Sequence, residues 1–110
     1  MNILLPGGSG FIGSHLSNEL LKDDKNKLII VDNLLTGNLE NIQNLLDSKN
    51  VTFIEHDVQD HIDIDEKLDY VLHLASAASP VAYTENPINT LKAGSLGTIN
   101  TLGLARKHNA

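Results

Sequence analysis

A glycine-rich turn near the amino terminus limits what this chain can fold into more than any other feature. The run Pro6–Gly13 (PGGSGFIG) directly follows a short apolar segment and leads into residues with helical spacing. Two patterns fit it: G-x-G-x-x-G with Gly8, Gly10 and Gly13, and G-x-x-G-x-x-G with Gly7, Gly10 and Gly13. Glycine allows the unusual dihedrals of such a turn and the close approach of a pyrophosphate. We expect the N–H groups at the helix start, from Phe11 and Ile12, to point at the phosphates.

A carboxylate follows at the distance expected for a dinucleotide site. Asp32 ends the second apolar segment, 19 residues after Gly13, where it can accept hydrogen bonds from the hydroxyl groups of an adenosine ribose. It would also repel the 2′-phosphate of NADP, and no Lys or Arg occurs between Asp32 and Lys49. The sequence therefore favours NAD. The alternative is a structural glycine turn followed by a solvated Asp.

Four apolar segments alternate with segments of helical spacing. We expect strands at Asn2–Leu5, Lys27–Val31, Val51–Ile54 and Asp69–Leu74, which are continuously apolar like strands covered on both faces. Helical spacing is shown by Ile12, Leu16 and Leu20 after the first strand, and by Leu39, Ile42, Leu45 and Leu46 after the second. This alternation implies a parallel sheet. The predicted fold class is α/β: residues 1–110 form the amino-terminal part of a Rossmann-type doubly wound domain, with strand order 3-2-1-4.

The last predicted helix has the clearest start signal. Asn86 is a suitable N-cap and Pro87 a suitable first helical residue. An apolar stripe is predicted from Leu91, Ile99, Leu102 and Ala105, and a basic carboxyl end from Arg106, Lys107 and His108. Gly94, Gly97 and Gly103 each cost roughly 1 kcal/mol relative to alanine. We therefore expect close packing or a ligand to offset them.

Composition excludes several classes of protein. The net charge of −6 and pI near 5.1 give no electrostatic footprint for nucleic acid or an anionic membrane. There is no cysteine, which excludes disulfides, a thiolate nucleophile and a Cys-type zinc site. His56, His61 and His73 are too scattered to predict a metal site. Met1–Leu5 has neither a basic region nor the length of a signal peptide or membrane span, so we expect a cytoplasmic protein.

Seven segments of the chain carry a resemblance to a known family, and those after the glycine turn are more specific than the turn itself. They lie at Gly7–Leu16, Val31–Gly37, His56–Val58, His73–Pro80, Asn86–Pro87, Leu91–Lys92 and Gly97–Ala105. With them the chain resembles the extended short-chain dehydrogenase/reductase family, which includes NAD-dependent epimerases and dehydratases. Within it the resemblance is closest to the UDP-glucuronate decarboxylases (UDP-xylose synthases) and their dTDP-glucose 4,6-dehydratase-like relatives. It covers the whole chain but only about the first third of such an enzyme.

The resemblance implies positions for the parts of NAD. Residues matching Asp57 and Val58 hold the adenine, through a carboxylate to its amino group and a backbone N–H. The adenosine ribose is wrapped by residues matching Asn33, Leu35, Thr36 and Gly37, and the nicotinamide side is lined by those matching Leu74, Ala75 and Ser76. These positions agree with the rule that ligands bind beyond the carboxyl ends of parallel strands. The alternative for Asp57 is to cap a helix that starts at Gln59.

For a sugar nucleotide, the resemblance points to Tyr83, Lys92 and Asn100. Lys92 could meet a diphosphate, and the alternative is a solvated lysine on a helix. Asn100 and Tyr83 could instead satisfy backbone groups.

The chain departs from the family pattern at Pro6, where Thr is usual, and at Ala77, where decarboxylases often have Pro. Ala93-Gly94 stands where many members have Thr-Asn. These differences leave the choice among nucleotide-sugar enzymes open.

No catalytic residue is predicted. Catalysis in this family uses a Tyr and a Lys four residues apart, with an upstream Ser or Thr. Leu74 follows four residues after Tyr70, and Pro87 four residues after Tyr83. We therefore expect the chain alone to be inactive.

The resemblance implies a lyase reaction for the complete enzyme. NAD oxidises C4 of UDP-glucuronate, the 4-keto acid loses carbon dioxide, and NADH reduces the ketone to give UDP-xylose. Two alternatives remain: a piece of a dTDP-glucose 4,6-dehydratase or 4-epimerase, and a non-catalytic NAD-binding or interaction module. The partners expected are a UDP-sugar and a second copy or a carboxyl-terminal portion, because the fourth strand would be an unpaired edge.

Overall fold

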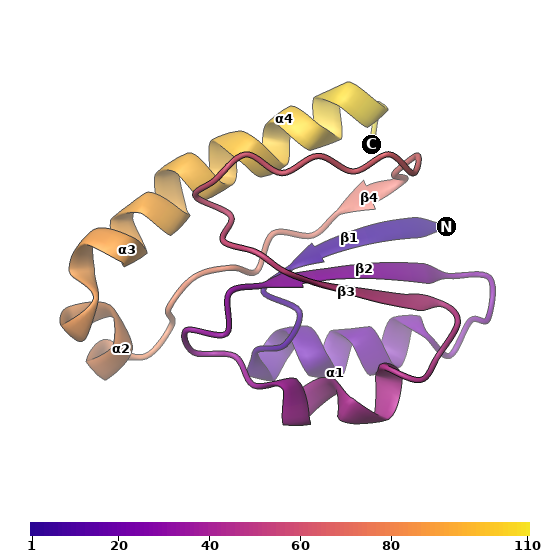
Figure 1. Ribbon diagram of the computed structural model, residues 1–110, viewed down its shortest axis with the longest axis horizontal. Helices are drawn as coiled ribbons and strands as arrows, with labels where there is room; N and C mark the ends of the chain where they lie inside the picture. The colour runs from indigo at the N-terminus through magenta and orange to yellow at the C-terminus, as the bar shows by residue number, and fades with distance from the viewer.

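The computed structural model describes residues 1–110, and a parallel four-stranded sheet forms its centre (Figure 1). The strands are β1 (Asn2–Pro6), β2 (Lys27–Asp32), β3 (Val51–Glu55) and β4 (Tyr70–Val71), in the order β3-β2-β1-β4. This confirms the predicted fold class and strand order. The helices α1 (Phe11–Leu20) and η1 (Leu39–Leu45) cover one face of the sheet, and the helical segment that ends in α4 (Thr98–His108) covers the other.

The strands are apolar on both faces because each face is covered. Alternate residues of β1 and β2 point to opposite sides and enter two separate cores. On the α4 side the core contains Leu4, Ile29, Val31, Ile62, Ile64, Leu68 and Leu104. On the α1 and η1 side it contains Ile3, Leu28, Ile30, Ile42 and Leu45. The continuous apolar runs therefore indicated the right architecture.

Strand β4 is shorter than the predicted Asp69–Leu74. Only Tyr70 and Val71 pair with β1 as strand residues. The N–H groups of Leu72 and Leu74 still donate to the Leu4 and Pro6 carbonyl oxygens, at 2.9 and 2.8 Å. The chain thus follows β1 to its carboxyl end and then turns away over the glycine turn.

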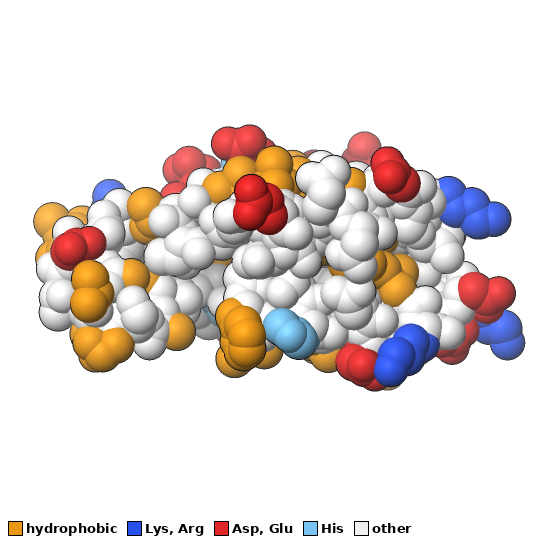
Figure 2. Space-filling view, turned by 90° about the horizontal axis from the view of Figure 1, so that it is seen from below, with side chains coloured by type: hydrophobic (Ala, Val, Ile, Leu, Met, Phe, Trp, Pro, Cys, Tyr) orange, Lys and Arg blue, Asp and Glu red, His pale blue; other side chains and the backbone are white.

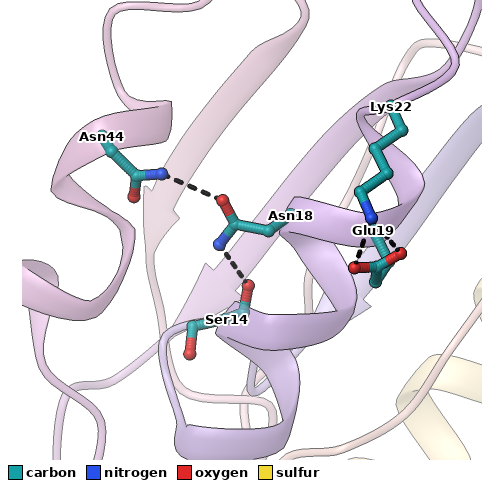
Figure 3. Close-up of polar contacts among 5 residues, drawn as sticks. All are labelled: Ser14, Asn18, Glu19, Lys22 and Asn44. Carbon is teal, nitrogen blue, oxygen red and sulfur yellow. Dashed lines mark hydrogen bonds and ion pairs between the residues drawn. The ribbon is translucent and has the colours of Figure 1, made fainter.

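Helix α1 is buried mainly through small residues, and only part of the predicted stripe packs: Leu20 contacts the core and Leu16 is half-buried. The buried residues of α1 are Gly13, Ser14 and Ser17, whereas Ile12 is 66% exposed. Small side chains let a helix lie close to the glycine turn and the sheet. Two asparagines hold the helix to η1 (Figure 3): Asn44 Nδ2 donates to Asn18 Oδ1 at 2.9 Å, and Asn18 Nδ2 donates to the Ser14 carbonyl at 2.8 Å.

The second predicted helix is a 3₁₀ helix. Ile42 and Leu45 are its buried residues, and their spacing of three matches the three residues per turn of that helix. Asn38 caps it by accepting a hydrogen bond from the Glu40 N–H at 3.0 Å.

A short helix, α2 (Pro80–Glu85), was not predicted. Its signal was the same as that used for the last helix: Ser79 caps it through the Ala82 N–H at 3.1 Å, and Pro80 is its first residue.

The last helix begins at Pro87 as predicted but is not uniform. It consists of α3 (Pro87–Lys92), a π-helical turn η2 (Ala93–Gly97) and α4. Asn86 occupies the N-cap position without a side-chain cap, because its amide donates to the Ala82 carbonyl at 3.2 Å. Helical polar side chains also bond to carbonyls four residues back: Ser95 to Leu91 and Thr98 to Gly94.

The predicted apolar stripe of this helix does not face the sheet. Leu91, Ile99 and Leu102 are exposed and Ala105 is half-buried, whereas the buried residues are Gly97, Thr101 and Leu104. Gly97 needs to be glycine, since a Cβ there would lie 2.6 Å from Val58 Cγ2. Nothing lies within 4 Å of a Cβ at Gly94 or Gly103, so packing does not offset their cost. None of the helices is both long and apolar enough to span a membrane.

Candidate functional site

A cleft opens where the four strands end. It encloses about 610 Å³ of space continuous with solvent, and it lies at the carboxyl ends of the strands, where parallel α/β sheets bind ligands. Five segments line it: the glycine turn, the loops after β2, β3 and β4, and the α3–η2 region. The lining residues are Gly7, Gly10, Asp32, Asn33, Leu35, Thr36, Gly37, His56, Asp57, Val58, Gln59, Leu74, Ala75, Ser76, Ala77, Asn89, Thr90 and Ala93.

All predicted cofactor residues except Phe11, Ile12 and Gly13 line this cleft. Phe11 and Ile12 form the first turn of α1, directly beyond the cleft residue Gly10. Their side chains are exposed, and their predicted role uses only backbone N–H groups. Gly13 is buried behind the turn. The sequence motifs thus come together at one site.

Gly7 and Gly13 shape the turn, whereas Gly10 leaves it open. Gly7 has φ +84°, and a Cβ there would lie 2.5 Å from the Leu74 carbonyl carbon. A Cβ on Gly13 would lie 2.3 Å from the Gly7 carbonyl oxygen. At Gly10 a Cβ would meet only that oxygen, at 3.3 Å. The fold therefore requires Gly7 and Gly13, while Gly10 keeps free space on the floor of the cleft.

The start of α1 adds free hydrogen-bond donors to this floor. Gly10 is the N-cap residue and supplies no capping side chain. The first N–H groups of a helix have no partner within the helix, and they carry the positive end of its dipole. An anion bound beside Gly10 would accept hydrogen bonds from these N–H groups and would be stabilised by the positive end of the dipole.

Asp32 is fixed at the edge of the cleft by the backbone. Its side chain accepts hydrogen bonds from the Ser9 N–H at 3.1 Å and from the Leu34 N–H at 2.9 Å. Leu34 takes a left-handed conformation with φ +58° to make this contact. Asp32 is 8% exposed, and no Lys or Arg lines the cleft. A hydroxyl group that faces Asp32 would find an acceptor, and a phosphate would find only repulsion.

Asp57 lies two residues beyond the end of β3, beside Asn33. Its Oδ2 accepts from Asn33 Nδ2 at 2.8 Å, and its Oδ1 accepts from the Gln59 N–H at 2.9 Å. Residues 56–69, between β3 and β4, contain no helix. Capping a helix from Gln59 is therefore wrong for Asp57, although the residue does fix a turn while it lines the cleft.

The three predicted substrate residues lie outside the cleft lining. Tyr83 on α2 and Lys92 at the end of α3 are both exposed. The Asn100 amide donates to the carbonyl oxygens of Val58, Gln59 and Asp60, at 2.8, 3.2 and 3.0 Å. This is the backbone role weighed as the alternative for Asn100. Substrate binding by the three residues stays a prediction.

Sequence reasoning missed several residues of the cleft: His56, Gln59, Ala77, Asn89, Thr90 and Ala93. His56 and Gln59 flank Asp57 and Val58, so the rule that strand ends line ligand sites could have found them. Asn89, Thr90 and Ala93 come from the helix that crosses the cleft. Their position depends on tertiary packing that no local motif signals.

His73 lies under the π-helical turn beside the cleft. Burial lowers the pKa of His73, against a smaller opposite effect of the Ala93 backbone. Its Nδ1 is buried without a hydrogen-bond partner, and its Cε1 lies 3.6 Å from the position of a Cβ on Gly97.

The cleft itself offers donors and acceptors suited to binding a phosphorylated, hydroxyl-rich molecule.

A family model described as GDP-mannose 4,6 dehydratase matches residues 4–110. The chain belongs to this family. Members similar to it include UDP-glucuronic acid decarboxylase 3 of Arabidopsis thaliana, with 42% identity over 107 residues, which cover 97% of this chain and 31% of the relative. UDP-glucuronic acid decarboxylase 1 of Danio rerio is 44% identical over 105 residues, which cover 96% and 24%. The chain thus spans at most about a third of these curated relatives, and the predicted resemblance is confirmed.

Solved structures of related enzymes share the fold of this GDP-mannose 4,6 dehydratase family member. The UDP-glucose 4-epimerase of Thermotoga maritima, solved with UDP-glucose, has a TM-score of 0.80 and 31% identity, covering 100% of this chain and 35% of the epimerase. The UDP-glucose 4-epimerase of Thermus thermophilus, solved in complex with NAD, has a TM-score of 0.74 and 30% identity, covering 99% and 35%. Both are nucleotide-sugar enzymes.

Proposed function

We propose that this chain is the NAD-binding portion of a nucleotide-sugar enzyme, and specifically of a UDP-glucuronate decarboxylase. One observation carries the proposal: the cleft at the strand ends combines an open glycine turn at Gly10 with the fixed Asp32 carboxylate. The decarboxylase assignment is supported by the relatives with 42% and 44% identity. The cofactor is supported by the related epimerase that was solved with NAD.

The free space and the polar groups of the cleft are compatible with NAD. The space beside Gly10, which a side chain would fill, is where a pyrophosphate could meet the Phe11 and Ile12 N–H groups. Asp32 would accept hydrogen bonds from the adenosine ribose hydroxyls, and Asp57 would accept one from the adenine amino group. Residues 74–76, beyond β4, would line the nicotinamide side.

In the complete enzyme, bound NAD would supply the hydride acceptor and donor for chemistry at C4 of the sugar. The residues of this chain bind and orient: helix α1 and the glycine turn hold phosphates, and the two carboxylates fix the adenosine. None of the 110 residues forms the Tyr and Lys pair that the family uses. We therefore propose that this chain alone does not turn over UDP-glucuronate.

A 4-epimerase is the second candidate, because the related solved structures are 4-epimerases at 31% and 30% identity. A dTDP-glucose 4,6-dehydratase and a non-catalytic NAD-binding or interaction module remain the other candidates. For the complete protein we propose a UDP-sugar substrate, a cytoplasmic location, and association with a second copy or with further segments of the enzyme. Incubation of the chain with NAD and UDP-glucuronate, with product analysis for UDP-xylose, separates a binding portion from an active enzyme.

Calorimetric titration with NAD and NADP tests the binding proposal. We expect weak binding of NAD and at least about tenfold weaker binding of NADP, equivalent to about 1.4 kcal/mol. Asp32→Ala and Gly10→Val should each abolish detectable NAD binding, while the exposed Lys92→Ala variant should bind like the parent. If the parent binds NAD and both cleft variants keep its affinity, the proposed site is wrong.

A further inference from the structure

Asn33, Asp57 and Gln59 form a connected group at the mouth of the cleft, here called the Asp57 clamp. The last backbone hydrogen bond between β2 and β3 runs from the His56 N–H to the Asp32 carbonyl, at 3.0 Å. One residue further on each strand, side chains take over: Asn33 Nδ2 donates to Asp57 Oδ2 at 2.8 Å. The clamp therefore bridges two strands just where their backbones separate to form the cleft.

Its partners determine the orientation of the Asn33 amide. Asn33 Oδ1 accepts a hydrogen bond from the Leu35 N–H at 3.0 Å, while Nδ2 faces the carboxylate. A flipped amide would set oxygen against oxygen on one side and N–H against N–H on the other. Asn33 is thus held by the loop it belongs to and presents a fixed donor to Asp57.

The Asp57 carboxylate is held by three donors. Oδ1 accepts from the Gln59 N–H at 2.9 Å, and Oδ2 accepts from Asn33 Nδ2 and from Gln59 Nε2 at 3.2 Å. A carboxylate offers about four acceptor positions. One position on Oδ1 therefore stays free, and its direction is set by the clamp.

We propose that Asn33 is a positioning residue that aims the free acceptor of Asp57 at the exocyclic amino group of an adenine ring. This inference rests on the proposed function, because it assumes that the adenosine end of the ligand lies at Asp57. The chemistry selects the base: a fixed carboxylate accepts from the 6-amino group of adenine and repels the 6-oxo group of hypoxanthine. A site built to bond one group rejects the analogue that lacks it, provided that the site cannot turn away.

NMR titration of the 110-residue chain with AMP and with IMP tests the inference, because these probes differ only at the 6-position and at the adjacent N1, which carries a proton in IMP. We expect the parent to bind AMP about tenfold more tightly than IMP, the effect of one charge-assisted hydrogen bond. Asn33→Ser keeps an acceptor for the Leu35 N–H but is too short to reach Asp57. It should reduce the preference for AMP to about twofold or less.

Two further variants separate positioning from general damage. Gln59→Ala removes the weaker donor but keeps the backbone N–H, so it should retain most of the preference. Asn44→Ala removes an amide that bonds to Asn18 on the other face of the sheet, and it should leave both affinities unchanged. An Asn33→Ser variant that binds AMP and IMP in the parental ratio overturns the inference and leaves the proposed function intact. A folded parent that binds neither AMP nor NAD overturns both.

Discussion

The side-chain amide of Asn100 on α4 donates a hydrogen bond to the carbonyl oxygen of Val58, 2.8 Å away in the loop after β3. The same nitrogen also reaches the carbonyl oxygens of Gln59 and Asp60. One side chain on the last helix thus holds the segment that follows Asp57. The cleft depends on α4 for its shape, although no α4 residue lines it.

Replacement of Asn100 should therefore affect the fold before it affects any substrate. Asn100→Asp keeps the size of the side chain but sets a carboxylate against three carbonyl oxygens. We expect its free energy of unfolding to fall by about 1–3 kcal/mol, measured by urea denaturation. Lys92→Ala, at an exposed position of the same helical segment, should change it by no more than about 0.5 kcal/mol. Equal stabilities for Asn100→Asp and the parent would contradict the backbone role.

Two glycines of the phosphate turn should differ in how much stability they lose on substitution by alanine. In Gly13→Ala the new methyl group would overlap the Gly7 carbonyl oxygen, so we expect a loss of about 3 kcal/mol in the free energy of unfolding. Gly10→Ala brings its methyl group near one backbone atom only, the Gly7 carbonyl oxygen at 3.3 Å, and at an N-cap it should cost less than about 1 kcal/mol.

NAD binding, in contrast, should be weakened by substitution at Gly10. We expect Gly10→Ala to weaken NAD binding about tenfold, because the methyl group occupies the space proposed for the pyrophosphate. Urea denaturation and calorimetry on the same samples separate the two effects. A Gly10→Ala chain with parental NAD affinity would show that the phosphates do not approach there.

Sequence patterns predicted the sheet well because its signal is local. Continuous apolar runs located β1, β2 and β3 to within a residue, and the burial of β1 and β2 on both faces follows from the same pattern. The helix faces were predicted less well. On α1 the fully buried residues are Gly13, Ser14 and Ser17, while Leu20 of the predicted stripe is only partly buried against the core and Ile12 is exposed.

The site shows the same division between local and tertiary information. Asp32 ends β2 and Asp57 follows β3, and the strand-end rule places both at the cleft without any knowledge of packing. Asn89 and Ala93 also line the cleft, but only because a helix that begins at Pro87 crosses it. The Asn33–Asp57 bond likewise depends on the register of β2 and β3, which the sequence does not state.

Stability should depend on pH through His73. Its pKa is lowered from 6.5 by burial in the folded chain, so below pH 6.5 the unfolded chain binds a proton more readily than the folded chain. The contribution of neutral, half-buried His73 to the free energy of unfolding is therefore fully present above about pH 6.5 and is lost as the pH falls through the folded pKa. We expect urea midpoints to decrease from pH 7.5 to 5.5, and to decrease less in His73→Gln. His15→Gln, at an exposed position, should retain the parental slope, and a His73→Gln slope equal to the parental one would contradict the assignment.

A row of exposed apolar side chains on the last helical segment makes self-association testable. Ile88, Leu91, Ile99 and Leu102 are each at least 64% exposed. Hydrophobic side chains also gather at the end of the molecule where α2 lies (Figure 2), but α2 is not part of this row. The π-helical turn between Leu91 and Ile99 holds about one residue more than an α-helical turn. Eight residues therefore span about two turns and return Ile99 to the side of Leu91.

Because isolated soluble chains rarely leave such a row uncovered, we expect concentration-dependent dimers in sedimentation experiments. The double variant Leu91→Glu and Leu102→Glu should shift the chain to monomer by placing two carboxylates in the contact. Val81→Glu, on α2 and 64% exposed, is the matched control outside the row and should leave the dimer intact. A parent that sediments as one monomeric species at every concentration would show that this row alone does not drive association.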